Sequence, residues 1–272
     1  MREARRVSDL HLRRDDELAV SSALELVALP GLPMIGEGDD VAELIAIALA
    51  GRELRDRDVI VVAQKIVSKA EGRIVDLARI TASAEASQLA AEVGKDPRLV
   101  EVILGESVHV VRSRPNLVIV QHRLGFVMAN AGVDQSNVAP ADGVERVLLL
   151  PRDPDGSAEA IRAKLQRRFG VEIGVIINDS FGRAWRRGTC GVAIGAAGLP
   201  GLQDLRGQPD LFGRILEVSV VGFADEIAAA ASLLQGQGAE AQPVVLVRGL
   251  QWQAAAGGAA QLVRQPEEDL FR

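Results

Sequence analysis

Apolar residues recur along the chain with two spacings, one typical of helices and one typical of strands. Apolar residues at helical spacing follow Asp39 and Asp40, which can cap a helix, and Gly51 ends that pattern. The apolar run 58–63 predicts a buried strand, and the polar segment 64–69 follows it directly. Further helices are predicted over 84–93, from Pro97, from a cap at Ser157 to Phe169, and over 224–234. Further strands are predicted over 24–29, 108–111, 117–121, 125–129, 146–150, 173–177, 215–221 and 244–247.

The order of these elements predicts the fold class. Strands and helices interleave, but several strands also follow one another directly. That order favours an α/β, or mixed α+β, sheet over a purely parallel, doubly wound one. Residues 1–22 lack a clear apolar period and are predicted to form a loosely ordered extension. Residues 23–272 are predicted to form one domain, with room for two subdomains.

Composition narrows the class of protein. The 272 residues are 48% hydrophobic and 25% charged, which is typical of a globular protein. No apolar run reaches the ~18 residues of a membrane span. The single cysteine, Cys190, excludes an internal disulfide and a multi-cysteine zinc site, and it suits a reducing cytoplasm. The net charge of −6 disfavours a nucleic-acid partner.

Oxygen-donor side chains gather in two polar segments after predicted strands. The chain has neither a P-loop nor a dinucleotide-binding glycine motif. Instead, segment 130–137 carries Asp134 among amides, and Asp179 and Ser180 follow the strand over 173–177. Carboxylate and hydroxyl oxygens suit Mg²⁺ or Mn²⁺. Taken singly, each segment also fits an ordinary turn rich in Asp and Asn, or a capped loop.

Cationic and glycine-rich segments complete the candidate chemistry. Lys65 and Lys69 lie four residues apart in a chain with only four lysines, and three arginines follow between positions 183 and 187. Both kinds of side chain bind phosphate. The glycines of segment 236–238 permit close backbone approach, although this stretch read alone is better explained by a plain helix end. The lysines likewise fit a solvated strand end. Together, the four segments suggest metal-assisted phosphoryl transfer.

Several long motifs resemble one family of ligases. The sequence from about Leu24 to the C-terminus is similar, in motif order and spacing, to the coenzyme F-420:L-glutamate ligase family. Family members usually carry Thr where this chain has Asn178, and Pro where it has Ala184, and both positions flank the implied metal ligands Asp179 and Ser180. The resemblance is carried by residues 31–45, 61–77, 130–138, 149–162, 174–195, 210–218, 224–237 and 243–250.

The resemblance implies an activity, cofactors and an assembly. It implies a GTP-dependent ligase that adds L-glutamate to a deazaflavin precursor through an acyl phosphate, and then extends a γ-linked glutamate tail. It implies two Mg²⁺ or Mn²⁺ ions, with K⁺ as a further candidate. It also implies an unusual mixed-sheet fold and an intertwined homodimer with each site near the subunit interface. The alternatives are a related metal-dependent ligase with another acceptor, and a GTP-binding regulator without catalysis.

The resemblance also implies roles for individual residues. Lys69 and Arg187 are the implied catalytic cations, Lys69 facing the phosphates, while Arg183 and Arg186 are weaker candidates for the acidic substrate. The implied metal ligands are Asp134 and Asp179, with Ser180 and Gln237 at a second metal. The implied nucleotide contacts are Leu32, Pro33, Met34, Ile35, Gln64, Lys65, Lys69, Asn137, Gly236, Gln237 and Gly238.

Overall fold

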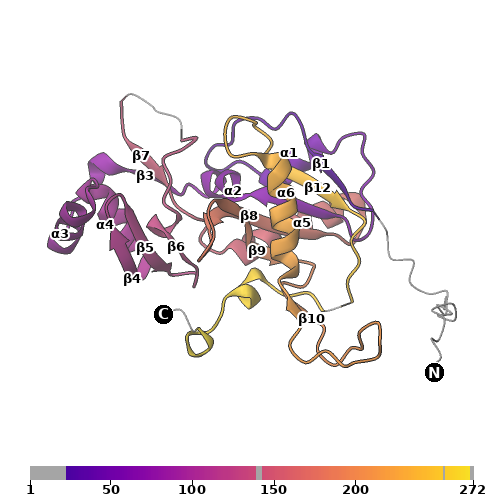
Figure 1. Cartoon of the computed structure of the whole chain (residues 1–272). Coiled ribbons are helices and arrows are strands. Elements are labelled where there is room, and N and C mark those ends of the chain that lie inside the picture. Colours follow the sequence, from indigo (N-terminus) through magenta and orange to yellow (C-terminus); the bar gives the residue numbers. More distant parts are fainter. Residues whose placement is uncertain (1–22, 139–142, 254, 270–272) are drawn as a thin grey trace, which may run out of the picture.

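A five-stranded sheet forms the centre of the molecule. The computed structural model describes residues 23–138, 143–253 and 255–269, so the predicted extension over 1–22 lies outside the described residues. All neighbouring strands of the sheet are antiparallel except β2 and β8, which run parallel. The predicted mixed α/β class is therefore confirmed (Figure 1). In order across the sheet, the strands are β1 (Glu25–Ala28), β12 (Val244–Arg248), β2 (Val59–Ala63), β8 (Gly174–Gly182) and β9 (Thr189–Ala197).

Helices cover both faces of this sheet. Successive residues of a strand point to opposite faces. Accordingly Ile60 and Val62 of β2 pack in one core cluster, and Val59 and Val61 pack in another. The first cluster contains side chains of α1 (Val41–Ala48), α2 (Gln64–Ala70) and α5 (Pro154–Phe169), and the second contains those of α6 (Phe223–Gln235).

A smaller unit lies beside the main sheet and is called here the small lobe (residues 84–132). Its helices α3 (Ala84–Val93) and α4 (Pro97–Gly105) pack against a three-stranded antiparallel sheet. Figure 1 shows this lobe at one side of the main sheet, with the β3–β7 pair at the boundary. The strands of the lobe are β4 (Ser107–Arg114), β5 (Leu117–His122) and β6 (Val127–Ala129), and the boundary pair is β3 (Ile74–Asp76) with β7 (Arg146–Leu148).

Short elements complete the described chain. Strands β10 (Gln203–Asp204) and β11 (Val220–Val221) pair at the base of a projecting segment, called here the arm (residues 205–219). The arm is the orange loop that leaves the body of the molecule near β10 in Figure 1. The short helical turns are η2 (Leu77–Arg79), η3 (Asn130–Gly132), η4 (Ala259–Leu262) and η5 (Pro266–Glu268).

The structure corrects four predicted elements. The strand predicted over 215–221 is wrong, because only Val220–Val221 form a strand, while Ile215 makes an isolated bridge with Pro209 on the exposed arm. The polar segment 64–69 is helix α2, whose buried face packs on the core. Helix α5 begins at Pro154 instead of Ser157, because Asp153 accepts the Gly156 N–H. Helix α1 is capped by Asp40 alone and ends at Ala48, before Gly51.

Strand β9 was not predicted, because its small residues have weak strand propensity. A side chain at Gly191 would overlap the backbone of α6, and one at Gly195 would overlap the backbone of α5. The two glycines therefore let helices on opposite faces approach the same edge strand closely. Asp225 and Asp155 accept hydrogen bonds from two β9 N–H groups, at 2.9 and 2.8 Å. These carboxylates cover an edge that would otherwise offer unpaired donors.

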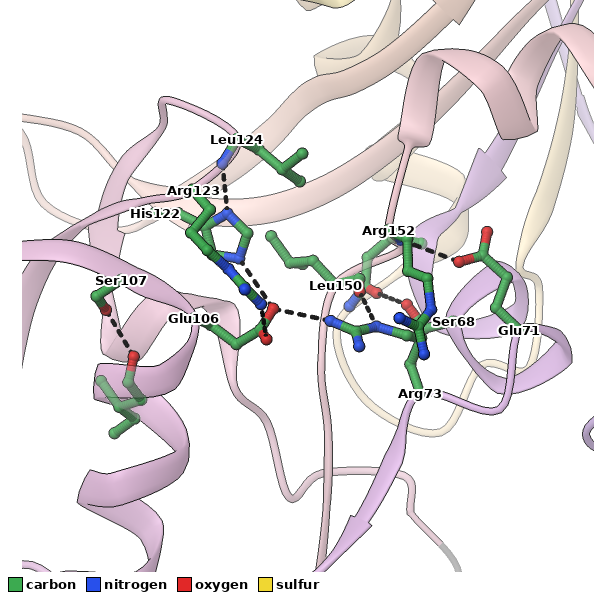
Figure 2. A network of polar contacts seen from close by, with 12 residues as sticks. Ser68, Glu71, Arg73, Glu106, Ser107, His122, Arg123, Leu124, Leu150 and Arg152 are labelled. Atoms are coloured by element: carbon green, nitrogen blue, oxygen red, sulfur yellow. Dashed lines mark hydrogen bonds and ion pairs between the residues drawn. The ribbon is translucent and has the colours of Figure 1, made fainter. Parts of the chain in front are cut away.

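A buried charge cluster joins the small lobe to the segment that follows α2 (Figure 2). Glu106, after α4, is 7% exposed, and its carboxylate contacts the guanidinium groups of Arg73 at 2.8 Å and of Arg123. His122 Nε2 lies 3.6 Å from the same carboxylate. Arg73 also donates through Nε to the Leu150 carbonyl at 2.9 Å. Burial alone would raise the pKa of Glu106, but His122 and the two guanidinium groups lower it below its usual value.

Glu106→Gln should destabilise the protein, because it leaves Arg73 buried without an opposite charge. We expect the free energy of unfolding at neutral pH to fall by about 3–5 kcal/mol. Since the pKa of Glu106 is below 4.5 in the folded state, its contribution is complete above that pH and is lost as the pH falls through the folded value.

Urea unfolding at neutral and acidic pH measures both effects. Glu145→Gln is the matched control, because Glu145 forms an exposed ion pair with Arg98. An exposed pair contributes about 0–1 kcal/mol. Equal losses in the two variants, or the same acid dependence in Glu106→Gln and the parent protein, would contradict the assignment.

Candidate active site

The parallel pairing of β2 and β8 brings two distant polar residues together. Ala63 pairs with Asn178, so the next residues, Gln64 and Asp179, are neighbours at the carboxyl end of β2, where its parallel pairing with β8 stops. Ligands of α/β sheets bind at such ends. The Gln64 side-chain amide oxygen, Oε1, accepts a hydrogen bond from the Ser68 hydroxyl at 2.8 Å, and the Gln64 side chain also hydrogen-bonds Asp179. Burial raises the pKa of Asp179 above its usual value, and the negative charge of Asp134 acts in the same direction.

A left-handed turn directs the chain from the small lobe to Asp134. Asn130, Ala131 and Gly132 have φ angles of 52°, 54° and 66°. Left-handed backbone costs a non-glycine residue roughly 1–2 kcal/mol. Here the turn is fixed by burial, because Ala131 has no exposed surface. Asp134 is then anchored by two backbone hydrogen bonds with Leu148, of 3.0 and 2.8 Å.

Two lysines of α2 hold the segment that follows this turn. The Lys65 ammonium lies 2.6 Å from an Asp134 carboxylate oxygen and donates to the Ser136 hydroxyl at 2.5 Å. One helical turn later, the Lys69 ammonium donates to the Asn137 carbonyl at 2.9 Å. Burial lowers the pKa of Lys69, and the positive charge of Lys65 lowers it further. Burial would raise the pKa of Asp134, but hydrogen bonds from Lys65 and Ser136 lower it below its usual value.

A second polar group lies on the opposite face of β8. The Gln237 amide donates to the Ser180 hydroxyl at 2.8 Å. Buried Asn178 and Gln235 exchange two amide hydrogen bonds, of 2.7 and 3.1 Å. The two glutamines that bind this face come from the end of α6 (Gln235) and from the segment after it (Gln237), whereas Asp179 faces α2. Asp179 and Ser180 therefore point to different sides of the strand.

The remaining candidates lie in three other places. Residues 32–35 lead to a loop that is tied to α2, because the Gly38 N–H donates to the Ala70 carbonyl at 2.9 Å. Within this segment Ile35 is buried against the core, while Met34 is exposed. Gly236 and Gly238 flank Gln237 on the Ser180 side of β8. The three arginines lie on the exposed loop between β8 and β9, and within the described residues their side chains form no ion pair.

The sequence comparison identifies the family. The family model for F420-0:gamma-glutamyl ligases matches residues 31–249. This range includes Lys65, Lys69, Asp134 and Asp179, which are called here the lysine–aspartate cluster. The chain belongs to this family. A relative from Methanothermobacter thermautotrophicus is 49% identical over 253 residues, covering 92% of this chain and 99% of its own. Relatives from Archaeoglobus fulgidus and Haloarcula marismortui are 44% and 42% identical, and each covers 92% of this chain and 96% of its own. All three are named coenzyme F420:L-glutamate ligase.

The donor set of this F420-0:gamma-glutamyl ligase family member fits a hard divalent cation. Within the described ranges, no group of three or more His, Cys, Asp or Glu side chains is arranged to hold a metal ion. Asp134 and Asp179 are close enough for their charges to interact, so they offer two carboxylates. Mg²⁺ is commonly held by one or two carboxylates together with water and substrate phosphates. The pair therefore suits a metal that arrives with a phosphorylated ligand.

Sequence reasoning missed two hydroxyl groups of the site. Ser136 donates both its N–H and its hydroxyl to Asp134, at 2.7 and 2.8 Å. Ser68 orients the Gln64 amide. A hydroxyl two residues after an aspartate is typical of an Asx turn, so this signal was present for Ser136. Among the described residues of this family member, no helix is long and apolar enough to cross a membrane.

Lys65→Met should destabilise the fold, because two interacting carboxylates lose the ammonium between them. Hydrogen bonds to charged groups contribute about 1.5–3 kcal/mol, so we expect a loss of unfolding free energy in that range. Urea unfolding without divalent cations measures it. Lys95→Met is the control, because Lys95 has no ion pair with a described residue. A Lys65→Met protein as stable as Lys95→Met would contradict the proposed electrostatic role.

Proposed function

We propose that this chain joins the amine of L-glutamate to a carboxylate of a deazaflavin precursor of coenzyme F420, with GTP as phosphoryl donor. Family membership and the names of the relatives support a ligase that acts on F420 and glutamate. One observation carries the phosphoryl-transfer part of the proposal. Lys65, Lys69, Asp134 and Asp179 converge from three separate segments at the carboxyl end of β2, where its parallel pairing with β8 stops.

Phosphoryl transfer solves the chemical problem of this reaction. A carboxylate does not acylate an amine, because its leaving group would be an oxide. In the proposed route, an acceptor carboxylate oxygen attacks the γ-phosphorus of GTP, and GDP leaves. The glutamate amine then attacks the carbonyl carbon of the acyl phosphate, loses a proton and expels inorganic phosphate. The products are an amide, GDP and phosphate, and the reaction repeats on the new γ-carboxylate.

The geometry suggests a role for each charged residue. Lys69 lies in the last turn of α2, and its ammonium donates to the Asn137 carbonyl. From this position it would contact phosphate oxygens. Asp134 and Asp179 would hold one Mg²⁺ or Mn²⁺, and Ser180 with Gln237 would contribute to a second. A bound cation offsets the negative charge that builds up as phosphate and carboxylate approach each other. Lys65 meanwhile keeps the two carboxylates together.

Asp179→Asn should abolish turnover. The substitution keeps the shape of the side chain but removes one of the two carboxylates that face Lys65. The assay mixes purified protein with the unglutamylated precursor, L-glutamate, GTP and Mg²⁺ or Mn²⁺, and records product masses. We expect glutamyl additions with the unmodified chain, and a rate lower by at least about 10³-fold in the variant, as for other losses of transition-state charge stabilisation.

Glu92→Gln, on the exposed surface of α3, controls for handling and folding. Full activity of Asp179→Asn would remove Asp179 from the site. If the unmodified chain binds GTP but adds no glutamate, the function is a ligase with another acceptor or a regulator.

We further propose that the chain forms a homodimer through the arm. The arm exposes several large apolar side chains at once, including Leu211 at 95% and Phe212 at 91% exposure. Ile215 and Val218 on the same segment are also exposed. Contiguous exposed apolar surface is typical of a protein–protein interface. A second copy of the chain is the partner that the family resemblance favours.

Replacing both Leu211 and Phe212 by Asp should convert the dimer to a monomer, because charges at the centre of an apolar interface are desolvated without partners. Light scattering coupled to size-exclusion chromatography measures the molar mass. Val108→Asp, at an exposed apolar position of β4, is the control and should keep the dimer mass. A monomeric parent chain, or a double variant that remains dimeric, would contradict the interface.

A further inference from the structure

The loop between β8 and β9 concentrates uncompensated positive charge. The last ladder pair of the hairpin joins Gly182 and Thr189, so residues 183–188 form the loop. Arg183, Arg186 and Arg187 are all exposed, and the loop contains no acidic residue. Within the described residues, none of the three guanidinium groups has an ion-pair partner. Like charges this close repel one another, and an anion bound among them would relieve the repulsion.

Three arginines around the main sheet form ion pairs, by contrast. Arg162 contacts two glutamates, Arg168 contacts Glu43, and Arg248 contacts Asp58. The chain carries a net charge of −6, so carboxylates are abundant on its surface. The hairpin loop therefore differs in bringing three arginines without an acidic partner, among the described residues, into five consecutive positions.

The loop lies within reach of the candidate active site. Arg183 follows Ser180 by three residues, which limits the separation of their Cα atoms to at most about 11 Å. Asp179 precedes Ser180 on the same strand. A ligand held by the loop can therefore extend to the lysine–aspartate cluster. Guanidinium groups bind carboxylates through two parallel hydrogen bonds, so carboxylates are the natural ligands of such a loop.

We propose that the β8–β9 loop is a subsite for the carboxylates of the glutamate tail that the acceptor already carries, and that it governs tail length. This inference rests on the proposed function. Each cycle consumes one acceptor carboxylate and brings two with the new glutamate, so the acceptor gains one negative charge per addition. A loop with three uncompensated cations binds the glutamylated acceptor better than the unglutamylated one. Elongation depends on the loop more strongly than the first addition does.

Steady-state kinetics of the variant carrying Arg183→Gln and Arg186→Gln tests the proposal. The two acceptors compared are the precursor without glutamate and the same precursor with one glutamyl unit. Loss of one charge-assisted contact corresponds to about a tenfold change, so KM for the glutamylated acceptor should rise at least about tenfold. KM for the unglutamylated acceptor and KM for GTP should rise by smaller factors. Product masses should shift to shorter tails.

The matched control replaces Arg112 and Arg114 of β4, two exposed arginines of the small lobe, by Gln. It should keep the tail lengths of the parent chain. Equal rises in KM for both acceptors would overturn the subsite. A larger rise in KM for GTP would do the same, because it would place the arginines at the nucleotide phosphates. Failure of the parent chain to add any glutamate would overturn the proposed function itself, which separates the two cases.

Binding of a γ-linked triglutamate peptide without GTP provides a readout independent of turnover. Calorimetry should show binding to the parent chain and to the Arg112 and Arg114 control variant. In the loop variant the affinity should fall at least about tenfold. In the parent chain it should weaken as salt is raised, since the contact is between exposed charges. Equal affinity in the parent chain and the loop variant would overturn the proposal.

Discussion

The candidate site depends on one parallel pairing, that of β2 with β8. Every other neighbouring pair in the five-stranded sheet is antiparallel, and this parallel pairing stops where β2 ends, beside the middle of β8. The register Ala63–Asn178 places the start of α2 beside Asp179, and α2 in turn carries Lys65 and Lys69. A register shift of one residue would turn Asp179 to the opposite face. The buried apolar residues of both strands, which pack in separate clusters on the two faces, make that shift costly.

The small lobe contributes the other half of the site, and its placement depends on the Glu106 cluster. Asp134 belongs to a segment that leaves β6 of the lobe, whereas the lysines belong to the main sheet. Arg73 follows α2 directly and contacts a buried carboxylate of the lobe (Figure 2). A buried ion pair gains little net stability, because desolvation offsets the attraction. Its geometry is nevertheless restrictive, since a guanidinium and a carboxylate satisfy each other in few orientations. The Glu106 cluster is therefore better explained by its alignment of the small lobe with the main sheet than by a gain in stability.

The sequence predicts the centre of this fold better than its edge. The residues of β2, β12 and the first part of β8 are strongly apolar, because both faces of those strands are covered. Such apolar runs can be recognised from the sequence alone. Strand β9 is rich in Gly and Ala, because helices approach it closely on both faces. These small residues have weak strand propensity, so the sequence does not predict the strand. Helix α2 follows β2 with no turn residue and no side-chain cap, so nothing local marks the change from strand to helix. The charged residues themselves are visible, but their proximity depends on pairing between segments more than 100 residues apart.

The length of β8 determines which face of the sheet each of the candidate ligands Asp179 and Ser180 occupies. If the strand ended at Ile177, as the apolar run predicts, the following loop could turn Asp179 and Ser180 toward one ion. In the structure the strand continues to Gly182, paired with β9 throughout, and alternation directs the two side chains to opposite faces. Asp179 then belongs with Asp134 and the lysines, while Ser180 belongs with Gln237. The same continuation carries the ladder beyond Asp179, so that the β8–β9 loop begins with Arg183, four residues further along the chain.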